Sequence, residues 1–119
     1  MFKDIADKWT DALRSGSYEQ GAEFLRQNND FCCLGVLCDL YIQEHNVDEP
    51  ARKSWMMGSF RVSEGEHEDV VLPLAVKEWS GMQSVEGVLT ASDPLSTLND
   101  QGSTFSEIAD IIEERWEEL

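Results

Sequence analysis

Basic residues are scarce in this chain, and its second half has almost none. The 119 residues include 24 Asp and Glu against 9 Lys and Arg, a net charge of −15 at pH 7. Residues 1–63 hold seven basic and ten acidic groups, whereas residues 64–119 hold two basic and 14 acidic groups. An acidic field repels phosphates, so the composition argues against direct nucleic-acid binding and favours a basic partner surface or solubility alone.

Long apolar segments are also missing. Charged residues interrupt residues 1–14, which therefore lack the apolar stretch of an export signal. No run reaches the roughly 20 residues that a membrane-spanning helix needs. We therefore expect a cytoplasmic protein without membrane contact. Its three cysteines should be reduced, and their odd number argues against a disulfide framework.

The longest apolar run, residues 30–42, is the segment around which the rest of the chain is expected to fold. Its leucines recur at helical spacing, which predicts a short strand leading into a buried helix that ends near His45. Gly35 lies inside this helix, where it costs about 1 kcal/mol relative to Ala. We therefore expect another backbone to approach closely at Gly35.

Around this run the patterning predicts a single α+β domain over residues 1–119, with one core. An amphipathic helix should cover residues 2–13, with Gly16 following its last turn. The first predicted hairpin begins with a strand at 20–26, with Ala22 and Phe24 on one face, and turns at 27–29. A second hairpin should comprise 59–62 and 67–72, with Phe60, Val62, Val70 and Leu72 available to the core. The remaining predicted elements are a short helix between Pro73 and Gly81, a strand at 85–89, and one or two helical turns at 93–98. Residues 47–57 are expected to be irregular or a short helical turn.

The last helix has the strongest local signal. Thr104 and Glu107 form a capping box, and an apolar stripe runs from Phe105 to Leu119. The other face is acidic, and carboxylates near a helix C-terminus oppose the macrodipole, so local stability does not explain them. The predicted partner-contacting residues are Glu64, Glu66, Glu68 and Asp69 on the second hairpin and Glu113, Glu114, Glu117 and Glu118 on the last helix.

Two other kinds of site remain open as alternatives. A basic and aromatic cluster could hold a small ligand such as a nucleotide signal; it comprises Arg52, Lys53, Trp55 and Arg61. Thiols and imidazoles could hold zinc or supply a nucleophile; these are Cys32, Cys33, Cys38, His45 and His67. Their spacing lacks a Cys-x-x-Cys pair, and cysteines on an apolar helix usually pack as core. We therefore predict no catalytic residue, no metal and no cofactor.

Three stretches together resemble a family of small bacteriophage and prophage proteins. They are Trp9 to Gly21, the segment Asp30 to Leu40 with its sequence FCCLGVLCDL, and Leu98 to Glu113; Leu72 to Trp79 fits as well. The resemblance implies a phage accessory protein in the host cytoplasm that is not an enzyme. Such a protein would bind and inhibit a bacterial host protein or defence complex, as anti-CRISPR-like inhibitors and nucleic-acid mimics do.

Overall fold

The central element is the buried helix α2 (Cys33–Glu44), which follows directly from strand β3 (Asp30–Phe31). The computed structural model describes residues 1–45, 55–56, 59–63, 66–68 and 70–119. The first six residues of α2 are all buried. A Cβ atom on Gly35 would lie 1.7 Å from the carbonyl oxygen of Leu25. The predicted strand, buried helix and close backbone approach are therefore confirmed.

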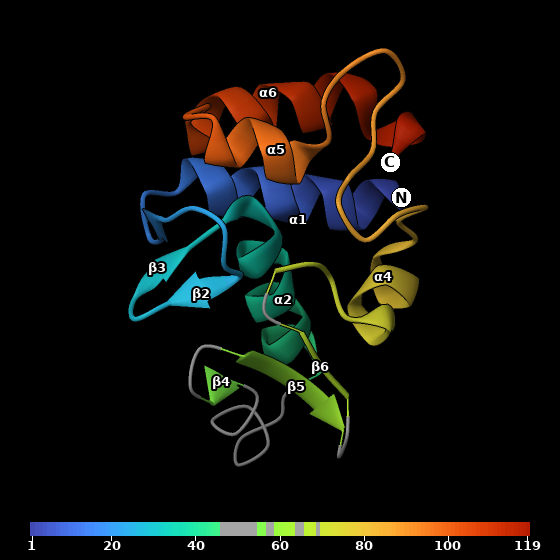
Figure 1. The fold of residues 1–119 in the computed structure, drawn as a ribbon. Helices are drawn as coiled ribbons and strands as arrows, with labels where there is room; N and C mark the ends of the chain where they lie inside the picture. The colour runs from blue at the N-terminus through green and yellow to red at the C-terminus, as the bar shows by residue number, and fades with distance from the viewer. Residues whose placement is uncertain (46–54, 57–58, 64–65, 69) are drawn as a thin grey trace.

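Helix α1 (Lys3–Arg14) lies between α2 and α6 (Phe105–Arg115), as Figure 1 shows. Its apolar face carries Trp9, which is fully buried and donates a hydrogen bond from Nε1 to the carbonyl of Cys33 at 2.9 Å. This bond holds α1 against the first turn of α2. Gly16 has a φ of +77°, the left-handed conformation expected just beyond the helix.

Shorter elements close the remaining sides of the core. The predicted short helix is present as α4 (Leu74–Ser80), and Gly81 ends it with a φ of 73°. The chain then continues through α5 (Leu95–Asp100), α6 and the 3₁₀ turn η1 (Trp116–Glu118). No helix in the described part of the chain is long and apolar enough to cross a bilayer.

Two small sheets complete the α+β fold. In the first, the order is β1-β3-β2, with β1 (Glu19–Gln20) parallel to β3 and β2 (Arg26–Gln27) antiparallel to it. The second has the order β4-β5-β6 and is antiparallel throughout. Its strands are β4 (Trp55–Met56), β5 (Ser59–Ser63) and β6 (Glu66–Glu68).

A buried asparagine at the end of α5 joins four segments of the chain. The side chain of Asn99, 3% exposed, accepts from the backbone N–H of Cys33 at 3.1 Å and donates to the carbonyl of Gly21 at 2.8 Å. It also accepts from Gln20, whose own amide oxygen accepts from the N–H of Phe105. Because α2 has no side-chain cap of its own, Asn99 caps it from another helix.

Several predictions about local structure were wrong. Residues 21–25 are not strand, and Leu25 is buried while Phe24 is 38% exposed and Ala22 is exposed. Glu23, with a φ of 72°, breaks the strand, and its N–H bonds to the carboxylate of Asp100 at 2.8 Å.

The other corrections concern single strands and side chains in the second half. Residues 85–89 form a loop because Gly87 adopts a φ of 74°, outside the strand region. Val70, predicted as core, is 47% exposed, whereas Leu72 is buried as predicted. Trp55–Met56 is a strand rather than irregular, and residues 46–54 and 57–58 of that stretch lie outside the described residues.

Candidate functional site

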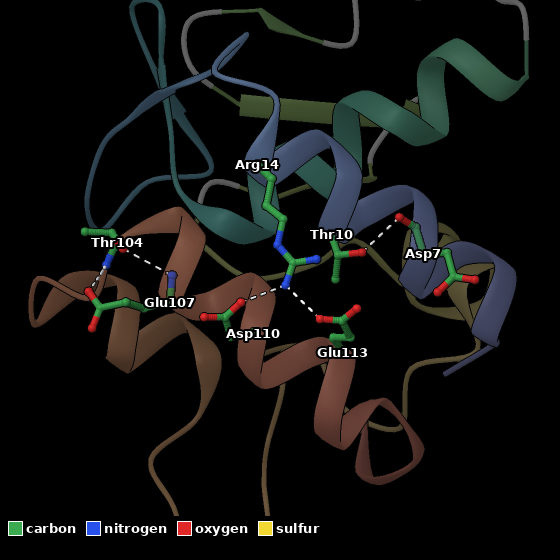
Figure 2. Close-up of polar contacts among 7 residues, drawn as sticks. All are labelled: Asp7, Thr10, Arg14, Thr104, Glu107, Asp110 and Glu113. Carbon is green, nitrogen blue, oxygen red and sulfur yellow. Dashed lines mark hydrogen bonds and ion pairs between the residues drawn. The ribbon is translucent and has the colours of Figure 1, made fainter.

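The predicted acidic helix α6 begins at the capping box that the sequence indicates. The N–H of Glu107 donates to Thr104 Oγ1 at 3.1 Å, and the N–H of Thr104 donates to Glu107 Oε1 at 3.0 Å (Figure 2). The hydrogen bond from the Thr104 N–H to its carboxylate lowers the pKa of Glu107 below its usual value. The Glu107 carboxylate therefore caps the start of α6 and is not a free charge available to a partner.

One arginine of α1 binds two carboxylates of α6. Arg14 Nη2 donates to Asp110 Oδ1 at 2.7 Å and to Glu113 Oε2 at 2.9 Å (Figure 2). Both hydrogen bonds raise the pKa of Arg14. The sequence patterns of the two helices, read separately, gave no sign of this contact, because the partners lie more than 90 positions apart.

Glu118, at the end of η1, is also held internally. It accepts from Arg115 Nε and Nη2, both at 2.7 Å, and from the backbone N–H of Thr90 at 3.0 Å. The hydrogen bonds from Arg115, followed by the one from Thr90, lower the pKa of Glu118 to about 2. Arg115 in turn donates to the carbonyl of Thr90 at 2.6 Å and to Ser92 Oγ at 2.9 Å. This cluster fastens the loop before α5 to the C-terminal turn.

The four helix carboxylates predicted to contact a partner therefore divide into two kinds. Glu113 and Glu118 have internal partners, whereas Glu114 and Glu117 are exposed and make no hydrogen bond or ion pair with any described residue. On α6, Asp110, Glu113 and Glu114 follow the i, i+3, i+4 spacing of one helix face, whereas Glu117 lies on η1, beyond the end of α6 at Arg115. These four exposed residues are here called the α6 acidic face.

The carboxylates of the second hairpin lie elsewhere. Glu66 and Glu68 are on β6, and Glu64 and Asp69 lie outside the described residues. The sheet containing β6 lies at the opposite end of the molecule from α6, with α1 and α2 between them (Figure 1). The described part of the hairpin, β6, and the last helix thus do not lie side by side.

The alternative ligand cluster is only partly described. The register pairs Trp55 on β4 with Phe60, and Arg61 on β5 with His67. Arg52 and Lys53 lie outside the described residues. The structure therefore places two of the four predicted ligand residues on one sheet and provides no description of the other two.

The three cysteines form part of the core. All are free thiols and buried, and burial raises the pKa of Cys32 to about 11 and those of Cys33 and Cys38 well above the usual value. Within the ranges that the structure describes, no three His, Cys, Asp or Glu side chains are grouped to hold a metal ion. Thiols held protonated in this way are weak nucleophiles.

A shallow depression of about 400 Å³ between α1 and α2 was not predicted from the sequence. It is called here the α1–α2 depression, and its lining residues are Lys8, Asp11, Leu40, Gln43 and Glu44. Lys8 and Asp11 are three positions apart on α1 and lie on one face of that helix. Leu40, Gln43 and Glu44 follow i, i+3, i+4 spacing and lie on one face of α2. Only the packing of the two helices brings the sets together, so no local pattern reveals it.

Comparison with known proteins places the chain in a family without assigning an activity. No curated protein and no solved structure matches it. A family model described as a domain of unknown function, DUF8296, matches residues 1–116. Because this match covers nearly the whole chain, the protein belongs to the DUF8296 family.

Proposed function

We propose that this protein is a phage accessory protein, not an enzyme, that binds and inhibits a bacterial protein or defence complex with a basic surface. The α6 acidic face is the proposed contact. The observation that supports it most directly is the pair of exposed carboxylates, Glu114 and Glu117, which have no ion pair or hydrogen bond among the described residues. Glu114 shares a helix face with Asp110 and Glu113, the two carboxylates that Arg14 binds.

The charge balance of the surface also supports a basic partner. Lys3–Arg14, the helix that packs beside α6, has three basic and three acidic residues and is neutral as a whole. Residues 105–119 have six acidic residues and one basic residue, Arg115, which Glu118 already pairs. A local excess of one sign raises the association rate with an oppositely charged surface and suppresses wrong partners.

The form of the face suits a partner that normally binds nucleic acid. Asp110 and Glu113 both accept from the guanidinium of Arg14, which restricts the separation of these two exposed carboxylates. Held negative charges resemble the phosphates of a nucleic-acid backbone more closely than freely rotating ones do, and they cost less side-chain entropy on binding. A nucleic-acid mimic is therefore the more specific form of this proposal.

The test is recovery of a bacterial partner by the tagged protein from a lysate, followed by quantitative comparison of two charge-reversal variants. In the first, Glu114→Lys/Glu117→Lys, the α6 acidic face is altered. In the control, Glu78→Lys/Glu86→Lys, the net charge changes equally at two exposed carboxylates elsewhere. We expect the first variant to lose at least about tenfold in affinity, equivalent to about 1.4 kcal/mol, and the control to bind like the original protein.

Two results would contradict the proposal. Equal recovery by both variants would show that the α6 acidic face is not the contact. An equal loss of affinity for the purified partner in both variants would show that only the overall charge matters. For a partner that binds DNA, displacement by duplex DNA tests the mimic directly, because a true mimic and DNA cannot occupy the same basic cleft together.

A further inference from the structure

The α1–α2 depression has more hydrogen-bond acceptors than the described residues satisfy. Asp11 has no hydrogen bond or ion pair with a described residue. Glu44 has one ion pair, to Lys8 Nζ at 3.4 Å, and both side chains are largely exposed, at 41% and 52%. Exposed pairs of this kind contribute little to stability, so Lys8 is readily displaced.

Gln43 presents a third acceptor because its amide nitrogen is already used. Gln43 Nε2 donates to Asp39 Oδ2 at 2.9 Å and to the hydroxyl oxygen of Tyr18 at 3.2 Å. The Tyr18 hydroxyl itself donates to the same carboxylate at 2.5 Å, and burial together with this bond raises the pKa of Tyr18. Because an ionised carboxylate only accepts, the nitrogen of Gln43 must face Asp39, which leaves its carbonyl oxygen as the free group.

The depression also has an aliphatic wall. Leu40 is partly exposed, between the buried core and the acceptors of Asp11, Gln43 and Glu44. Burial of an apolar stem here would remove exposed hydrocarbon from water. The single cation and two anions give the lining a net charge of −1, which disfavours an anionic ligand.

We propose that the α1–α2 depression takes an arginine side chain of the basic partner. The three-methylene stem packs on Leu40, while the planar guanidinium donates to Asp11, Glu44 and the carbonyl oxygen of Gln43. Arginine fits better than lysine because its five N–H groups are spread in one plane and reach acceptors from two helices at once. This assignment rests on the proposed function. It gives the basic partner a specific contact at the α1–α2 depression in addition to the α6 acidic face.

The experiment is a ¹H–¹⁵N NMR titration of the full chain with N-acetyl-arginine methylamide. The neutral probe is N-acetyl-citrulline methylamide, which has the same stem without the charge. We expect saturable shifts at the amides of Leu40 and Gln43 and at the Gln43 side-chain amide with the arginine probe, and at least tenfold weaker binding of the citrulline probe. Asp11→Asn/Glu44→Gln should weaken arginine binding at least tenfold, whereas Glu114→Gln/Glu117→Gln should leave it unchanged.

The outcomes separate this inference from the proposed function. Shifts confined to α6 would overturn the arginine site and leave the α6 acidic face as the contact. Equal binding of the two probes would also overturn it, since the charge would then play no part. Retained shifts at Leu40 and Gln43 in the Glu114→Gln/Glu117→Gln variant would support the site even if α6 failed to bind the partner.

Discussion

Replacing Gly35 by Ala tests whether the central helix is built against the backbone that crosses it. In an isolated helix this change stabilises by about 1 kcal/mol. Here the new Cβ would lie 1.7 Å from the oxygen and 2.7 Å from the carbon of the Leu25 carbonyl, where ordinary contact is 3.4–4 Å. The same carbonyl accepts the N–H of Cys32 at 3.2 Å, so moving it also weakens that hydrogen bond.

The magnitude follows from these opposing effects. Overpacking a core costs about 1–3 kcal/mol and occasionally more, and backbone atoms cannot move aside as a side chain can. Adding about 1 kcal/mol for the weakened hydrogen bond and subtracting the helix gain leaves a net loss of about 1–3 kcal/mol, and the contact with backbone atoms puts it near the upper value of about 3 kcal/mol. For a chain of this size we expect the melting temperature to fall by about 10 °C.

Denaturant unfolding and thermal melts followed by circular dichroism provide the measurement. Gly16→Ala is the control, because a Cβ there meets no atom within 4 Å and the cost is only that of a φ of +77°. That cost is about 1 kcal/mol. A Gly35→Ala protein at least as stable as the original would refute the close approach of residues 25 and 35 and the packing derived from it.

Three further changes test other parts of the structure. Asn99→Ala should lower the free energy of unfolding by about 3 kcal/mol, because it leaves buried backbone groups unpaired. Hydrogen exchange at the Cys33 amide should also accelerate. Unchanged protection of that amide would count against the cap that Asn99 provides to α2. The pKa of Glu118 falls from 4.5 to about 2 on folding, so its contribution is complete above pH 4.5 and is lost as the pH falls toward 2. The stability difference between the original protein and Glu118→Gln should therefore shrink over that range, and a pH-independent difference would argue against the ion pair. Finally, an aromatic disulfide reagent should label the three buried thiols far more slowly in the folded protein than in denaturant, and rapid labelling in the folded state would contradict their burial.

The sequence predicted the helices well because each has its own signal. The capping box at Thr104 and the left-handed glycine after α4 are confirmed, and Gly35 correctly indicated a backbone contact. The capping box and the glycine after α4 depend on neighbours within a few positions, whereas Gly35 indicated a contact without indicating that its partner is Leu25. The hairpin turn at Asn28, whose φ of 59° suits an asparagine, is likewise a local feature.

Features that depend on distant contacts were missed. Leu25, rather than Phe24, enters the core because the chain bends at Glu23, and that bend is fixed by Asp100 far along the sequence. The charge pattern identified α6 as acidic but could not show that Arg14 reaches across from α1. It also could not show that β6, the described strand of the acidic hairpin, lies at the far end of the molecule from α6 (Figure 1).

The most direct test of the proposed function is the dissociation constant for a purified partner, measured across a range of salt concentrations. The original protein and Glu78→Lys/Glu86→Lys should bind with equally steep salt dependence, because both keep the α6 acidic face. Glu114→Lys/Glu117→Lys should bind at least about tenfold more weakly at low salt and with a shallower slope. The same affinity and the same slope for all three proteins would contradict binding through this face.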